Sequence, residues 1–113
     1  MRVCVHVVPP NKNEEEEMDQ ERDIEAYLRR RVEMLGGMAM KFVSPGNDGA
    51  PDRIVIMPGG LVTFVELKAP GGRLRAIQKW QHEQIRKRGC EVRVIWNRMQ
   101  VDEWMQERGG DAR

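Results

Sequence analysis

The sequence contains few cysteines, few aromatic residues and no long apolar run, and each shortage excludes a class of protein. The two cysteines, Cys4 and Cys90, form no motif among 113 residues, and we interpret both as reduced thiols of a cytoplasmic protein. No apolar run approaches the roughly 20 residues that a membrane-spanning helix needs, so we expect no membrane association. The first apolar run stops at Pro9-Pro10 without a small-residue cleavage pattern, so we expect no secretory signal.

The composition indicates one globular domain of modest size. Hydrophobic residues make up 40% and charged residues 33% of the chain, which is too apolar for a disordered chain and too polar for a membrane protein. Residues 1–25 hold eight acidic and three basic residues, whereas residues 26–113 hold sixteen basic and ten acidic residues. This basic part suits a polyanionic partner, although solvated helix faces carry similar runs.

Apolar periodicity and turn residues predict a mixed α/β fold. We expect helices over 14–35, 74–88 and 101–108, strands over 38–43, 52–57, 61–68 and 90–96, and a strand or an ordered tail over 1–8. A helix between the third and fourth strands makes a parallel crossover the default. We therefore expect one domain over 1–113 with a mixed sheet flanked by helices, its core within about 14–97, and peripheral segments at 1–13 and 98–113.

Two carboxylates and a lysine are predicted to meet at one end of a hairpin. Glu66 and Lys68 share a face of their strand because side chains alternate along a strand. Pro58-Gly59-Gly60 is typical of a hairpin turn, and Asp52 and Glu66 each lie seven residues from Gly59. Two neighbouring carboxylates repel each other unless a cation lies between them, and oxygen ligands suit Mg²⁺ or Mn²⁺. A salt-bridge cluster without a metal is the alternative.

Two other polar residues are candidates for the same end of the sheet. Glu25 lies at the margin of the apolar stripe of the first helix, which directs it toward the sheet. It could instead pair with Arg29 one turn later, and Glu21 is a competing candidate one turn earlier. Gln78 lies near the start of the second helix and could reach the same end of the sheet, although it could equally be a solvated helix residue.

These residues match a known pattern. Gly49-Ala50-Pro51-Asp52, thirteen residues and then Glu66-Leu67-Lys68 resemble the signature of the PD-(D/E)XK nuclease superfamily. The finer resemblance is to the virus-type replication-repair nuclease domain, VRR-NUC. It also includes Asp23–Leu28, Gly36-Gly37, Lys41–Gly46, Arg53, Phe64-Val65, Ala69–Gly71 and Gln78.

The resemblance implies a restriction-endonuclease-like core with the order α-β-β-β-α-β and a metal site. Asp52, Glu66 and the main-chain carbonyl of Leu67 would bind Mg²⁺ or Mn²⁺, and Lys68 would orient or activate the attacking water.

The resemblance also assigns roles to the first and second helices. The catalytic acid of the first helix in related resolvases precedes the helix-ending glycine by eleven residues, and this spacing from Gly36 selects Glu25 over Glu21. Gln78 would support the water or the scissile phosphate.

The implied function is a metal-dependent DNA nuclease that selects branched, flap or Holliday-junction DNA in replication, repair or recombination. The alternative is a non-catalytic DNA-binding subunit that keeps the fold. Lys41, Ser44, Arg53 and Arg73 flank the predicted site and are candidates for contacts with the DNA backbone.

The resemblance also suggests a symmetric homodimer in a viral or bacterial setting, with the host cytoplasm as the location if the protein is viral. Trp80, Trp96 and Trp104 offer either apolar surface for such a contact or ordinary core packing.

Overall fold

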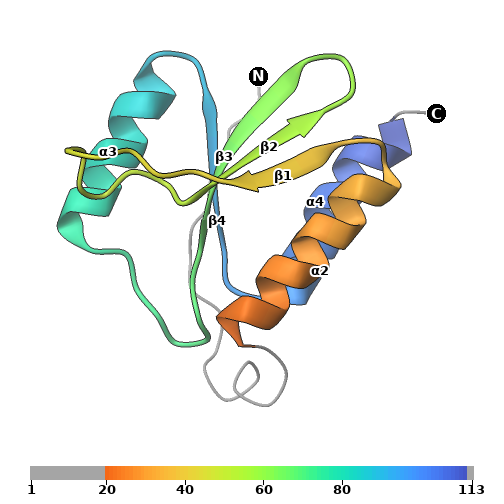
Figure 1. Cartoon of the computed structure of the whole chain (residues 1–113), viewed down its shortest axis with the longest axis horizontal. Coiled ribbons are helices and arrows are strands. Elements are labelled where there is room, and N and C mark those ends of the chain that lie inside the picture. Colours follow the sequence, from red (N-terminus) through yellow and green to blue (C-terminus); the bar gives the residue numbers. More distant parts are fainter. Residues whose placement is uncertain (1–19, 112–113) are drawn as a thin grey trace.

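The computed structural model describes residues 20–111, which form a four-stranded sheet with helices on both faces (Figure 1). The elements are α2 (Glu21–Met34), β1 (Met38–Lys41), β2 (Arg53–Met57), β3 (Leu61–Leu67), α3 (Ala76–Lys87), β4 (Glu91–Ile95) and α4 (Arg98–Asp111). This order confirms the predicted helix, three strands, helix, strand and final helix. The predicted strand over 1–8 and the predicted helical residues 14–19 lie outside the described residues.

The strand order is β1-β2-β3-β4, and the first three strands are antiparallel. Strands β2 and β3 form the predicted hairpin, in which Arg53 lies opposite Val65 and Met57 opposite Leu61. Strand β4 then pairs parallel to β3, with Leu67 opposite Ile95. The helix α3 supplies the connection, so the predicted parallel pairing is confirmed.

The hydrophobic core lies between the sheet and the pair α2 and α4. Helix α2 contributes Ile24, Leu28 and Val32 at helical spacing, all fully buried. The facing side chains of the sheet include Val55 and Val65, which alternate with residues on the opposite face. The opposite face carries α3 along its β4 side (Figure 1).

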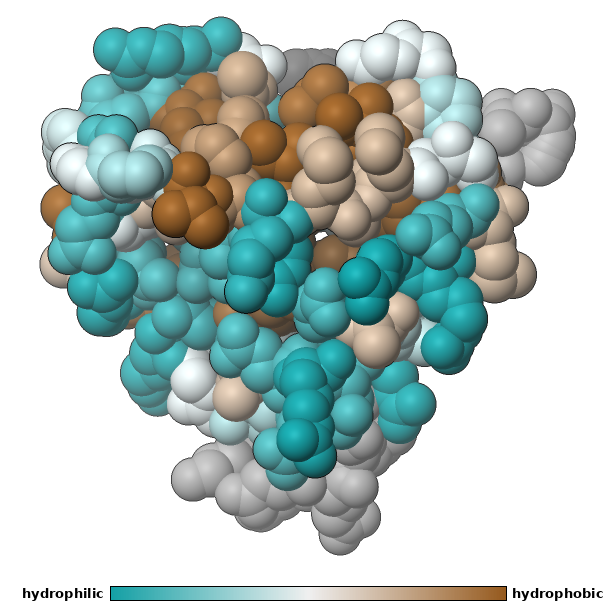
Figure 2. Space-filling model, viewed as in Figure 1, coloured by the Kyte–Doolittle hydropathy of each residue, from teal (hydrophilic) through white to brown (hydrophobic). Residues whose placement is uncertain are grey.

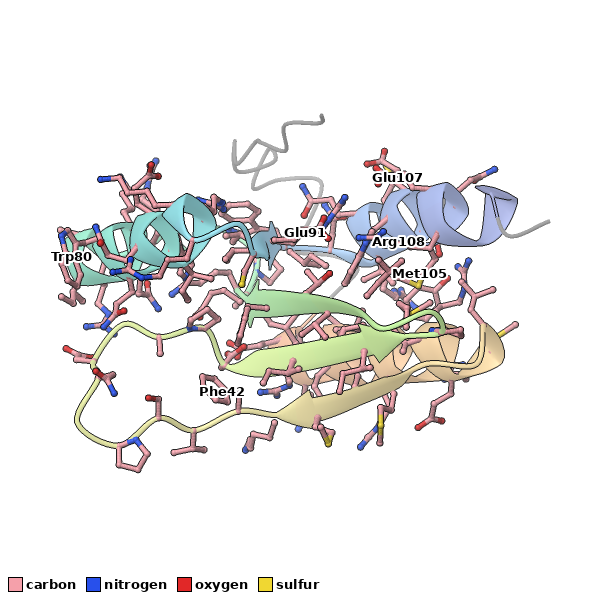
Figure 3. All side chains as sticks on the ribbon, turned by 90° about the horizontal axis from the view of Figure 1, so that it is seen from above. Phe42, Trp80, Glu91, Met105, Glu107 and Arg108 are labelled. Atoms are coloured by element: carbon pink, nitrogen blue, oxygen red, sulfur yellow. The ribbon has the colours of Figure 1, made fainter. Side chains whose placement is uncertain are left out.

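The last helix is an integral part of this core, which corrects the expectation that 98–113 is peripheral. It spans Arg98–Asp111 rather than 101–108, and it buries Val101, Trp104 and Met105. Figure 3 shows Glu107 and Arg108 of α4 near Glu91 of β4. Arg108 pairs with the Glu91 carboxylate, which also accepts a hydrogen bond from the Thr63 hydroxyl at 2.8 Å.

The three tryptophans have different environments. Trp96 and Trp104 are buried, as core packing predicts, whereas Trp80 on α3 is exposed. Within the part of the chain that the structure describes, no helix is long and apolar enough to span a membrane. Cys90 is a free, exposed thiol.

Candidate active site

The backbone on both sides fixes the position of Asp52 at the start of β2. The Asp52 N–H donates to the Val65 carbonyl at 3.1 Å, and the Asp52 carbonyl accepts from the Phe42 N–H at 2.9 Å. The Leu67 N–H donates to Asp52 Oδ1 at 3.3 Å. The β2–β3 register places Asp52 beside Glu66, as counting outward from Gly59 predicts.

Glu66 is the central buried carboxylate of the site. Glu66 Oε2 accepts a hydrogen bond from Gln78 Nε2 at 3.0 Å and lies 3.7 Å from Lys68 Nζ. The other carboxylate oxygen, Oε1, is buried and has no hydrogen-bond partner among the described residues. Glu66, Lys68 and Gln78 therefore form a connected group in which one carboxylate oxygen is left without a partner from the described part of the chain.

The amide of Gln78 is oriented by its own helix. Gln78 Oε1 accepts a hydrogen bond from the Arg75 N–H at 2.8 Å, where α3 begins. Because a helix leaves its first N–H groups without backbone partners, this contact caps α3. The acceptor end of the amide is thus occupied, and the NH₂ group is directed at Glu66.

Burial and a neighbouring charge change the acidity of the two carboxyl groups. Burial, followed by the negative charge of Asp52, raises the pKa of Glu66 from 4.5 to about 7, although Lys68 opposes the change. Burial also raises the pKa of Asp52, against the opposing effect of Arg53. Both shifts express the cost of holding two negative charges in a poorly solvated place.

These residues fit a hard divalent cation. Two carboxylates and a backbone carbonyl are ligands that Mg²⁺ and Mn²⁺ favour, and Mg²⁺ usually keeps several waters as its remaining ligands. The buried, unpartnered Glu66 Oε1 is a donor atom that such an ion would satisfy. Among the described residues, no group of three or more His, Cys, Asp and Glu residues could hold a metal ion. Two carboxylates and one carbonyl would leave the remaining positions of such an ion to water.

Arg53 connects the first helix to the site. Its Nε lies 3.7 Å from Glu25 Oε2, and its Nη1 donates to the Asp52 carbonyl at 2.9 Å. Glu25 Oε1 also lies 3.8 Å from Arg29 Nη2, so the ion pair one turn along the helix, which is the alternative to a role in the site, is present as well. Glu21, the competing candidate, raises the pKa of both Asp52 and Glu66 through its charge. The geometry thus gives Glu21 electrostatic influence on the site and places Glu25 in an ion pair.

The four candidates for DNA contact differ in exposure. Lys41 ends β1 and is exposed, and Arg73 is exposed in the loop before α3. The Ser44 hydroxyl accepts a hydrogen bond from Asn47 Nδ2 at 2.9 Å, within the loop that precedes Asp52. The Arg53 side chain is only 12% exposed, so its contacts favour positioning Asp52 and Glu25 over touching DNA directly.

His82 is a buried residue that sequence reasoning did not single out. It lies one turn after Gln78 on α3, is fully buried, and neither ring nitrogen has a hydrogen-bond partner. Burial, assisted by the charges of Arg86 and Lys68, lowers the pKa of His82 to about 4. The spacing Gln78–His82 is the i, i+4 signal that places both on one helix face.

The sequence matches the profile of the VRR-NUC domain over residues 7–98, a range that contains Glu25, Asp52, Glu66, Lys68 and Gln78. The chain belongs to the VRR-NUC family. A relative, “Putative nuclease p44” of Acyrthosiphon pisum secondary endosymbiont phage 1, is 44% identical over 75 residues, which cover 66% of this chain and 81% of the relative. A solved VRR_NUC domain structure matches with a TM-score of 0.72 at 38% identity, over 76% of this chain and 94% of that one.

The family membership identifies this chain as a nuclease domain with the mixed α/β architecture predicted from its sequence. Most of α4 lies beyond the matched range. The VRR-NUC domain in this chain is therefore completed by a helix whose buried residues belong to the same core.

Proposed function

We propose that this VRR-NUC domain is a Mg²⁺- or Mn²⁺-dependent deoxyribonuclease that hydrolyses phosphodiester bonds in branched DNA. The proposal depends mainly on the environment of Glu66. Glu66 is a buried carboxylate with one unpartnered oxygen, it lies beside Asp52, and Gln78 and Lys68 contact its other oxygen. Such a costly arrangement is typical of functional sites.

Asp52, Glu66 and the main-chain carbonyl of Leu67 would hold the metal ion. When bound, a divalent ion supplies positive charge that offsets the two carboxylates and polarises the phosphate. The Leu67 N–H donates to Asp52 Oδ1 at 3.3 Å, which holds the backbone of Leu67 next to one of the proposed carboxylate ligands. The same contact fixes the relative positions of the two strand ends that carry the ligands.

Lys68 would act on the attacking water and the phosphate, whereas Gln78 would orient Glu66. In hydrolysis, a water oxygen bonds to phosphorus while a bridging P–O bond breaks and its oxygen leaves with a proton. The Lys68 ammonium would orient this water and stabilise the negative charge that develops on the phosphate oxygens. Gln78 would hold Glu66 in one orientation, because its acceptor oxygen is bound to the start of α3.

The DNA backbone would approach the site across its basic rim. Lys41 and Arg73 are both exposed; Lys41 lies opposite Arg53 at the end of β1, and Arg73 lies in the loop between β3 and α3. Phosphate contacts of this kind position a nucleic acid without reading its bases. Selection of branched DNA by shape is therefore the substrate preference that we propose.

We also propose that the domain acts as a homodimer. The support is an open apolar sheet face on the side of α3, formed by Met38 and Met40 of β1, Ile54 and Ile56 of β2, and Val62 and Phe64 of β3. Figure 2 shows apolar residues gathered in the upper half of one view of the molecule. A two-fold dimer would give one assembly two sites for a symmetric DNA junction.

Cleavage assays on defined DNA substrates test the proposed activity. The full chain is incubated with forked, flapped, four-way and linear DNA in the presence of Mg²⁺ or Mn²⁺ and then with a chelator. We expect faster cleavage of branched DNA, none with the chelator, and a loss of about 100- to 1,000-fold for Lys68→Ala. The matched control is Lys87→Ala, which removes an exposed lysine from the last turn of α3 and should keep full activity.

Two results would contradict the proposal. Cleavage that persists in the chelator or in Lys68→Ala would show that the activity does not depend on this site. Binding of branched DNA without any cleavage would favour the alternative, a non-catalytic subunit that retains the fold.

A further inference from the structure

Trp80 is exposed, although tryptophan has the largest side chain and a small domain has few such side chains with which to build its core. Its side chain is 56% exposed, whereas Trp96 and Trp104 are 1% and 0% exposed. Figure 3 shows Trp80 on the outer side of α3, away from the sheet. An exposed tryptophan contributes little to the core, so its ring is available for contact with a partner.

Trp80 lies on a surface that continues toward the candidate active site. Ile77, one turn earlier on α3, is also partly exposed, and its backbone packs against Gly49. Gln81 Nε2 donates to the Asp48 carbonyl at 3.2 Å. This part of α3 is therefore joined to the loop that ends at Asp52.

The same helix connects Trp80 to the carboxylates. Gln78, two residues before Trp80, donates to Glu66 from the buried side of α3. Residues two apart project from nearly opposite sides of a helix, which is 10–12 Å wide with its side chains. Because stacked nucleotides of one strand repeat every 3.4 Å along the axis, this width corresponds to about three nucleotides counted from a phosphate that would bind at Glu66.

The surroundings of Trp80 suit a polyanion. Residues 73–81, which surround Trp80, contain three basic residues and no acidic residue, a balance of +3. Lys79 is next to Trp80 and exposed. The Arg75 guanidinium at the start of α3 lies 3.3 Å from the exposed Asp48 carboxylate, which offsets part of this charge.

We infer that Trp80 stacks on an unpaired base of the DNA about three nucleotides from the scissile phosphate, an inference that rests on the proposed nuclease function. An indole ring stacks on bases of any sequence, but it needs a free base face. Bases inside a duplex cover each other's faces, whereas those in a single-stranded arm do not. Trp80 would thus make the domain prefer DNA that carries an unpaired arm next to the cleaved strand.

Tryptophan fluorescence tests the contact directly, because Trp80 is the exposed one of the three tryptophans in the chain. Lys68→Ala protein, used so that the DNA stays intact, is titrated with a fork that has single-stranded arms and with a blunt duplex in Mg²⁺. We expect the fork to quench the fluorescence and the duplex to leave it nearly unchanged. Replacing Trp80 with Phe in the same protein should abolish the quenching and keep the fork affinity within about threefold.

Affinity measurements complete the test. Trp80→Ala in the Lys68→Ala protein should bind the fork about 5- to 150-fold more weakly, the range expected for one lost base–aromatic contact. Met99→Ala, which shortens an exposed apolar side chain on α4 (65% exposed, against 56% for Trp80), should bind as tightly as the parent. The unfolding temperatures of the Trp80→Ala and Met99→Ala proteins should match that of the parent, because the Trp80 and Met99 side chains are exposed.

The outcomes separate this inference from the proposed function. Fork binding with unchanged fluorescence and unchanged affinity in Trp80→Ala would overturn the inference and leave the nuclease proposal standing. If no form of the protein binds DNA, the nuclease proposal fails and the stacking contact fails with it.

Discussion

At the scale of single residues, Glu66 has the most unusual environment among the carboxylates of the site. It is buried beside another acid, and its hydrogen bond from Gln78 replaces only part of the solvation that it loses. Burial and the neighbouring Asp52 charge accordingly raise the pKa of Glu66 to about 7. A domain that needs these two carboxylates only for structure would be more stable with neutral side chains there, and this cost supports the cation site that we propose.

Glu66 and His82 should have opposite effects on the pH dependence of stability. A carboxyl group whose pKa rises on folding, here from 4.5 to about 7, stabilises the folded state at low pH and loses that contribution as the pH rises to about 7. An imidazole whose pKa falls on folding, here from 6.5 to about 4, contributes stability above pH 6.5 that is lost as the pH falls toward 4. Each effect is of the order of 3 kcal/mol. We therefore predict a shallow profile for the metal-free protein between pH 4.5 and 6.5.

Two variants separate the opposing effects in urea unfolding measured with a chelator. Glu66→Gln should become more stable as the pH rises from 4.5 to 6.5, because the contribution of His82 remains. His82→Leu should lose stability as the pH rises toward 7, in the direction that Asp52 also favours. Identical pH slopes for the wild type and both variants would contradict these assignments.

The sequence was sufficient to pair Asp52 with Glu66 because that pairing depends on local geometry. Side-chain alternation and a short turn determine which residues of a hairpin face each other. The orientation of Gln78 and the burial of His82 depend instead on how α3 docks on the sheet. A single sequence gives the helical spacing of those two residues but not the contacts that each one makes.

At the scale of elements, the loop between β1 and β2 depends on its contact with α3. Gly49 has φ +90°, and a Cβ atom there would lie 2.7 Å from the Ile77 carbonyl oxygen. The left-handed conformation and the close approach both require glycine. This contact holds the segment that leads to Asp52 against the helix that carries Gln78.

Replacing Gly49 with alanine should destabilise the domain and weaken metal binding. We predict a loss of about 2–5 kcal/mol, from backbone strain and from the clash with Ile77 together. Thermal unfolding measures the loss, and Mn²⁺ titration calorimetry measures the metal affinity.

Gly46 in the same loop provides the matched control. It has φ +83°, but a Cβ atom there would meet nothing within 4 Å. Gly46→Ala should therefore lose only about 1–2 kcal/mol and retain its metal affinity. Equal losses in the two variants would show that the contact between Gly49 and α3 contributes nothing.

Helix α4 shows where prediction of elements was incomplete. Its buried residues Val101, Trp104 and Met105 have the spacing i, i+3, i+4 of an amphipathic helix. The sequence contains this signal, but the three apolar residues cover little more than one helical turn, and so short a pattern predicts only a peripheral helix over 101–108. Contacts with α2, including a hydrogen bond of 2.6 Å from the Tyr27 hydroxyl to Asp102, extend the helix and join it to the core.

At the scale of the whole molecule, the open apolar face of β1, β2 and β3 is the surface that we expect to form the homodimer. Light scattering after size-exclusion chromatography should give twice the chain mass of 13.1 kDa. Met40 lies on this face and is 42% exposed. Met40→Asp should give monomers, because it would bury a charge without a partner.

Met99 on α4 supplies the control for this prediction. It is more exposed than Met40, at 65%, but it lies on another element. Met99→Asp should remain dimeric. A monomeric wild type, or a dimer that survives Met40→Asp, would exclude this face as the interface.

The most direct test of the proposed metal centre is a crystal of the full chain grown with Mn²⁺ and measured at a wavelength where manganese scatters anomalously. We predict an anomalous peak within bonding distance of the Asp52 and Glu66 carboxylates and the Leu67 carbonyl, with the peak absent in Asp52→Asn. A crystal saturated with Mn²⁺ in which the ion binds elsewhere, while Glu66 stays paired with Lys68, would contradict the proposed metal centre.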